Sequence, residues 1–140
     1  PDASLDGFLR RDFHKMRALC DSITLYADHT DFALWYSEIF NRCQAVGKHP
    51  FDIVESPSIL SSQHGRHTKT PLDIDVIDVS CMDNNMHGMR HNFFDINRLM
   101  VDDLREILTT RSRASRRSRL IHRCTNVWSF LTAPSHVKNK

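Results

Sequence analysis

Two carboxylates and two histidines follow the two most strand-like stretches of the sequence. Asp28 and Asp31 come just after the first apolar, β-branched run, and His87 and His91 lie in the polar stretch after the second. Working residues in open α/β sheets sit on the loops that follow the carboxyl ends of strands. An acid and then a histidine, in that chain order, are the last two members of a Ser…Asp…His catalytic triad. In such a triad the carboxylate orients the imidazole, and the imidazole takes the proton of a serine hydroxyl.

Two predicted strands would position these side chains. Residues 23–27 are rich in β-branched and aromatic residues, which favours a strand. Residues 74–79 form the second strand, and their apolar side chains do not alternate strictly, which is typical of a strand covered on both faces. Helical spacing of apolar residues predicts three amphipathic helices, at about 5–20, 32–43 and 93–109.

The alternation of helices and strands predicts an α/β fold with parallel neighbouring strands and right-handed crossovers. We expect about two to three strands flanked by helices and hence an incomplete sheet, because two parallel strands leave edges and apolar surface uncovered. Asp2, Ser4 or Asp6 can cap the first helix, and Thr30 or Asp31 can cap the second.

Two further segments lack strong periodicity. Residues 44–71 contain two glycines and three prolines, so they are predicted to form a long loop or insertion with a short strand at 51–54. Residues 110–140 begin with six arginines between 111 and 123 and are predicted to be a basic, solvated tail with a short apolar stretch near its end.

Several of these segments resemble the α/β-hydrolase superfamily, and most closely a branch of largely uncharacterised, esterase-like proteins. Residues 23–34 (I-T-L-Y-A-D-H-T-D-F-A-L) resemble the late strand and acid loop of that branch, Y-A-S-x-x-D-x-A-L, with Asp31 on the acid position. Residues 75–80 (D-V-I-D-V-S) resemble its D-x-I-D-x-S strand, and residues 91–94 (H-N-F-F) resemble its H-S-Y-F. The resemblance spans roughly residues 1–109.

The resemblance implies that residues 1–109 are the C-terminal portion of a parallel-sheet α/β-hydrolase domain. It implies Asp31 and His91 as the catalytic acid and base, with Asp28 and His87 as the alternatives. The intact protein would then be a serine hydrolase acting on a small-molecule ester or similar acyl substrate, and it would need no cofactor.

Two positions depart from the branch, and the nucleophile motif is absent. Arg90 stands where the branch usually has glycine, and Asp28 stands where it often has serine. A nucleophile elbow needs G-x-S-x-G, yet no two of the four glycines are four positions apart. We therefore expect the nucleophile upstream of Pro1, the chain to be a fragment of a longer protein, and the isolated chain to be inactive.

Other functions find less support in the residue pattern. His64-x-x-His67 and His87-x-x-x-His91 with Cys81 contain usable metal ligands, but further ligands are not evident, so no metal site is predicted. The four cysteines form no C-x-x-C pair and are expected to be reduced.

The arginine-rich segment defines the alternative function, a non-catalytic binding module or degenerate hydrolase relative that contacts anionic partners. The net charge is only +2 and the arginine run contains no aromatic residue, which argues against nucleic-acid binding. No apolar run reaches the roughly 18–20 residues that span a bilayer, and no signal peptide is visible, so a cytoplasmic location is the default expectation. The sequence leaves the oligomeric state open.

Overall fold

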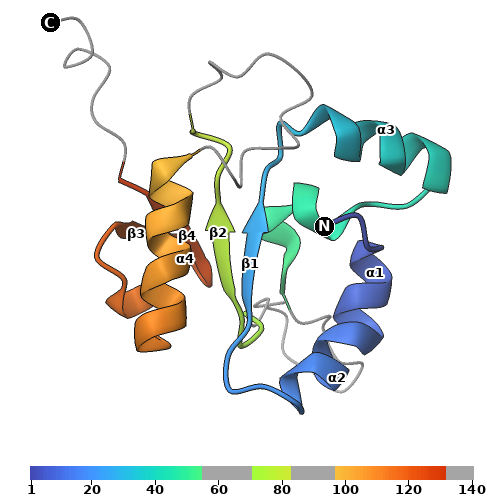
Figure 1. Cartoon of the computed structure of the whole chain (residues 1–140). Coiled ribbons are helices and arrows are strands. Elements are labelled where there is room, and N and C mark those ends of the chain that lie inside the picture. The colour runs from blue at the N-terminus through green and yellow to red at the C-terminus, as the bar shows by residue number, and fades with distance from the viewer. Residues whose placement is uncertain (55–70, 83–96, 132–140) are drawn as a thin grey trace, which may run out of the picture.

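The structure is a computed structural model that describes residues 1–54, 71–82 and 97–131. In these residues one sheet contains four strands in the spatial order β1-β2-β4-β3 (Figure 1). The strands are β1 (Thr24–Ala27), β2 (Asp75–Asp78), β3 (Leu120–Cys124) and β4 (Val127–Phe130). The first two pair in parallel, as predicted, and β4 is also parallel to β2, whereas β3 pairs antiparallel with β4. The α/β class is confirmed, with a mixed sheet rather than a purely parallel one.

Helices cover both faces of the sheet, with α1 and α2 to one side of the β1–β2 pair and α4 to the other (Figure 1). The apolar residues of the central strand β2 do not alternate with polar ones, because both faces of this strand are covered. Val76 packs among residues of the first helical segment, while Ile77 packs with Met100 of α4, and each is 0% exposed. A strand covered on both faces was predicted for residues 74–79, and the burial of these residues confirms it.

The N-terminal helical segment consists of α1 (Leu5–Gly7), a π-helical stretch η1 (Phe8–Asp12) and α2 (Phe13–Arg17). Ser4 is the N-cap, and its hydroxyl accepts the backbone N–H of Gly7 at 3.4 Å. The helix predicted over 5–20 is therefore confirmed, but it ends three residues early.

Two longer helices complete the layers: α3 (Phe32–Asn41) follows β1, and α4 (Arg98–Thr110) precedes the C-terminal hairpin. Asn97 caps α4 and accepts the N–H of Leu99 at 2.9 Å. Both helices were predicted, although the residues 93–96 expected to begin the last one lie outside the described part. None of the helices in the described residues has the length and apolar character needed to cross a bilayer.

The segment expected to be a long loop is partly folded where the structure describes it. Short 3₁₀ helices form at η2 (Val46–Lys48) and η3 (Pro50–Asp52). The strand predicted at 51–54 was wrong, because the 3₁₀ turn occupies this stretch and only Val54 forms a single bridge with Pro71. The remaining residues of this segment, 55–70, lie outside the described part.

Residues 110–131 are not the solvated tail that their composition predicted. They contain the 3₁₀ turn η5 (Ala114–Arg116) and the β3–β4 hairpin, which supplies two of the four strands. Val127 and Phe130 are almost completely buried, because β4 enters the sheet beside β2. The additional strands that the predicted sheet required thus come from downstream in the sequence.

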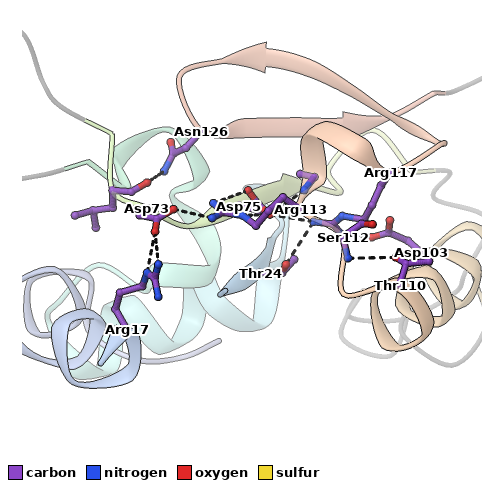
Figure 2. Close-up of polar contacts among 12 residues, drawn as sticks. Arg17, Thr24, Asp73, Asp75, Asp103, Thr110, Ser112, Arg113, Arg117 and Asn126 are labelled. Carbon is purple, nitrogen blue, oxygen red and sulfur yellow. Dashed lines mark hydrogen bonds and ion pairs between the residues drawn. The ribbon is translucent and has the colours of Figure 1, made fainter. Parts of the chain in front are cut away.

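Ion pairs at the amino ends of β1 and β2 explain why arginines can belong to a folded segment (Figure 2). The guanidinium of Arg113 donates to both Asp73 and Asp75, at 2.7 and 2.9 Å. Arg17 binds the other side of Asp73 at 2.7 Å, so hydrogen bonds from both arginines hold the pKa of this carboxyl below its usual range. Arg117 is fully buried and donates to Asp103 of α4 at 2.7 Å.

Candidate catalytic site at the carboxyl ends of the parallel strands

The parallel pairing of β1 and β2 brings the loops that follow them to the same edge of the sheet. Ala27 is the register partner of Asp78, and the N–H of Val79 donates to the carbonyl of Ala27 at 2.9 Å. One step further, the N–H of His29 donates to the hydroxyl of Ser80 at 3.0 Å. The two loops that carry the predicted acids and precede the predicted histidines are therefore joined directly at their bases.

Asp28 is the first acid after β1 and is only 3% exposed. Its Oδ1 accepts the backbone N–H of Thr30 at 2.8 Å and the hydroxyl of Thr30 at 2.7 Å. An aspartate that binds the backbone two residues on forms an Asx turn. The described contacts of Asp28 therefore shape the turn between β1 and α3.

Asp31 is equally buried, at 4% exposed, and is the N-cap of α3. Its Oδ1 accepts the backbone N–H groups of Ala33 and Leu34, at 2.8 and 3.2 Å. A carboxylate offers two oxygens with about four lone-pair sites. Capping fixes the orientation of the Asp31 side chain and is chemically compatible with accepting a hydrogen bond from an imidazole.

The last residue of β2, Asp78, adds a third carboxylate, which was not among the predicted site residues. Asp78 Oδ1 accepts both the N–H and the hydroxyl of Ser80, at 3.0 and 2.6 Å. The Nδ1 atom of the exposed His29 lies 3.9 Å from the same oxygen. The signal in the sequence was Asp-x-Ser at the end of a strand, which is typical of a side chain that closes a turn. The Ser80 hydroxyl donates to Asp78 and accepts the N–H of His29, so it links the two loops.

The charge at this edge also acts on Cys81. Desolvation of its sulfur, and then the charge of Asp78, raises the pKa of the Cys81 thiol, so this cysteine stays in its weakly nucleophilic protonated form. The edge is thus acidic, which suits a partner that becomes cationic, such as a histidine acting as general base.

His91 and His87 lie in residues 83–96, outside the described part of the chain. The structure therefore places both candidate acids, Asp31 and Asp28, but does not test which histidine either one meets. The pair His64 and His67 lies outside the described part as well. Among the residues that are described, no group of three or more His, Cys, Asp and Glu side chains could hold a metal ion.

No protein-family model, curated protein or solved structure matches this chain. The resemblance to the α/β hydrolases thus remains an inference from the residues of the sequence.

Proposed function

We propose that the chain supplies the acid and the histidine of a Ser–His–Asp triad in a hydrolase that cleaves an ester or similar acyl bond. Asp31 would be the acid and His91 the base. The observation that carries this proposal is the placement of Asp31: a carboxylate only 4% exposed, held by two backbone N–H groups at the carboxyl end of a parallel strand. A triad needs a buried, rigid carboxylate of this kind to fix the imidazole.

In the proposed mechanism each group has one task. His91 would take the proton of a serine hydroxyl as that oxygen attacks the acyl carbon, and it would then return the proton to the leaving group. Asp31 would hold the imidazole in one tautomer and stabilise its charged form. This chain has no G-x-S-x-G motif, so the serine and the oxyanion hole would have to come from outside these 140 residues.

Asp28 and His87 remain the alternative acid and base. Asp28 is as deeply buried as Asp31, and it precedes the same helix. The position of Asp31 in the Y-A-x-x-x-D-x-A-L pattern favours it over Asp28, and His91 is favoured over His87 by its flanking residues in the same way.

The alternative function, an anion-binding module built on the arginine-rich segment, receives less support from the structure. Arg113, Arg117 and Arg119 form ion pairs with aspartates of the same chain. Guanidinium groups that are already paired contribute little to an external anion site, because an anion would have to compete with a carboxylate at hydrogen-bond distance.

The tautomer of His91, read from the ¹⁵N signals of its ring, tests the proposed pair. Asp31→Asn is the informative variant, because asparagine retains an oxygen that can cap α3 but removes the carboxylate charge. We expect one fixed tautomer of His91 in the parent chain and a changed or mixed tautomer in Asp31→Asn.

Asp28→Asn serves as the matched control, since it alters the neighbouring buried carboxylate and should leave His91 unchanged. A response of His87 in place of His91 would correct the choice of base. If neither histidine responds to either substitution, the chain does not contain the proposed acid–base pair.

A further inference from the structure

Helix α3 carries a stripe of large apolar side chains that points away from the core. Only Leu34 of this helix is buried among its apolar residues, at 4% exposed. The exposed stripe consists of Phe32 (62%), Trp35 (46%), Tyr36 (54%), Ile39 (55%) and Phe40 (83%). These positions follow the spacing i, i+3, i+4, i+7 and i+8, which places them on one continuous helix face. This is the pattern of a helix that packs against a partner, yet it faces outward here.

The stripe is also free of charge. Glu38 is the single charged residue in the sequence of α3, and it lies on the other side of the helix. Its carboxylate receives Lys48 Nζ at 2.9 Å, His49 Nε2 at 2.6 Å and the backbone N–H of Ala45 at 2.9 Å. Glu38 therefore joins α3 to the segment that follows it and leaves the outer face purely apolar and aromatic.

The size of the stripe is that of an interface rather than of scattered surface residues. The exposed fractions of its five side chains amount to about three whole side chains, or roughly 600 Å² at about 200 Å² each. Apolar patches of this size are at the upper end of what monomeric proteins expose, roughly 300–600 Å². Two such faces in contact would bury about 1,200 Å², the lower limit for specific protein–protein interfaces, before the polar rim is included.

The chemistry of the stripe favours one occupant, a second copy of the same chain. A helix that lies on a membrane surface carries lysine or arginine on its polar face. Residues 32–41 contain neither of these residue types. A charged partner would find no complementary group on the stripe. An identical stripe is complementary to it, because aromatic and aliphatic side chains then meet their own kind without burying a charge.

We propose that the chain forms a homodimer in which α3 packs antiparallel against α3 of the second copy, about a two-fold axis at Tyr36. The two phenylalanines at the ends of the stripe are symmetric about this residue, because Phe32 and Phe40 each lie four positions from it. A two-fold contact is isologous, so Phe32 of each copy faces Phe40 of the other, and the two Tyr36 rings meet at the axis. The rings of Trp35 and Tyr36 already contact edge to face within one chain, at a centroid distance of 5.1 Å.

Sedimentation of the complete 140-residue chain over a range of concentrations tests the proposal. The parent chain is expected to sediment as a dimer. Tyr36→Glu should weaken dimerisation about 100-fold or more, because the axis would bring two like charges together. Leu108→Glu is the matched control: Leu108 is 80% exposed on α4, away from the stripe, and this variant should dimerise like the parent.

A charge exchange tests the antiparallel geometry. Phe32→Glu and Phe40→Lys should each weaken the dimer, whereas the double variant should restore it, because every glutamate would then face a lysine of the other copy. Circular dichroism of each variant shows whether the fold is retained. A monomer at all concentrations, or binding of the monomeric parent to phosphatidylcholine vesicles through α3, would overturn the proposal. Failure of the folded double variant to recover would overturn the two-fold arrangement.

Discussion

Arg117 joins the C-terminal segment to α4 and β1 through contacts with Asp103 and Thr24. Its side chain and that of Asp103 are both 0% exposed, and Asp103 Oδ2 also accepts the hydroxyl of Tyr26 at 2.6 Å. Within the described residues, Arg117 Nε and Asp103 Oδ1 have no hydrogen-bond partner. An ion pair buried in this way gains little net stability, but the loss of one partner leaves a charge buried without compensation.

Arg117→Met is therefore expected to lower the free energy of unfolding by about 3–5 kcal/mol, measured by urea denaturation at neutral pH. The exposed neighbour provides the control, since Arg116→Met should change stability by no more than about 0.5 kcal/mol. Replacing both partners, Asp103→Leu with Arg117→Met, should cost less than Arg117→Met alone. Equal effects of the two arginine substitutions would show that Arg117 is solvated.

Tyr26 gives a pH dependence whose sign follows from its surroundings. Burial and then the hydrogen bond to Asp103 raise the pKa of its hydroxyl well above the ordinary value of 10.0. The unfolded chain therefore loses this proton at a lower pH than the folded chain does. The contribution to stability is complete below pH 10.0 and is lost as the pH rises above it. Tyr26→Phe should make the loss of stability above that pH shallower.

The roles of some residues could be predicted from the sequence alone, and the roles of others could not. Thr30 or Asp31 was expected to cap α3, because a polar capping side chain directly before an apolar helical pattern is a local signal, and in the structure Asp31 is the cap. Arg117 could not be distinguished from Arg116 in advance. The partners of Arg117, Asp103 and Thr24, lie 14 and 93 residues away in sequence, and only the assembled sheet brings them together.

Substitutions at the N-cap of α3 can separate the structural role of Asp31 from its proposed catalytic role. Asp31→Ala removes the acceptor of two backbone N–H groups and is expected to lower the free energy of unfolding by about 0.5–2 kcal/mol. Asp31→Asn should cost much less, because asparagine is an equally good N-cap. Thermal unfolding monitored by circular dichroism measures both. If Asn destabilises as much as Ala does, the carboxylate charge itself supports the fold.

The elements that sequence patterns predicted well are those with strong local periodicity. Both central strands and all three predicted helical regions are present in the structure. The hairpin was missed because its strand β3 has a single buried residue, Leu120, and its polar residues resemble the arginine-rich stretch before it. Its place in the sheet depends on pairing with β4 and thus on contacts that no local pattern contains.

In the described residues both faces of the sheet are covered, while α3 exposes five large apolar side chains. The candidate site is at the carboxyl ends of the parallel strands, and the arginine ion pairs are at their amino ends. Charged groups at the two ends of the sheet thus have different roles. The arginine ion pairs at the amino ends of the strands fix the hairpin, and the carboxylates at the carboxyl ends form the acidic edge around Asp31.

The chain by itself should not hydrolyse activated esters above background. General acid–base catalysis contributes about 10²–10⁴-fold only where the base is positioned against a reacting group, and this chain has no G-x-S-x-G serine for His91 to activate. The test is the rate of p-nitrophenyl ester hydrolysis by the purified chain, compared with that of its His91→Ala variant. Turnover that is lost in this variant and survives further purification would show that the chain has a nucleophile of its own.

A crystal structure of this chain would show whether Asp31 orients His91, through the distance between their side chains. We expect a carboxylate oxygen of Asp31 within about 2.6–3.2 Å of an imidazole nitrogen of His91, or slightly further without substrate. If His87 occupies that position, the triad remains and the choice of histidine is wrong. Imidazoles of His87 and His91 that both lie more than about 10 Å from Asp31 and Asp28, beyond the reach of a hydrogen bond or a single bridging water, would show that neither aspartate orients a histidine.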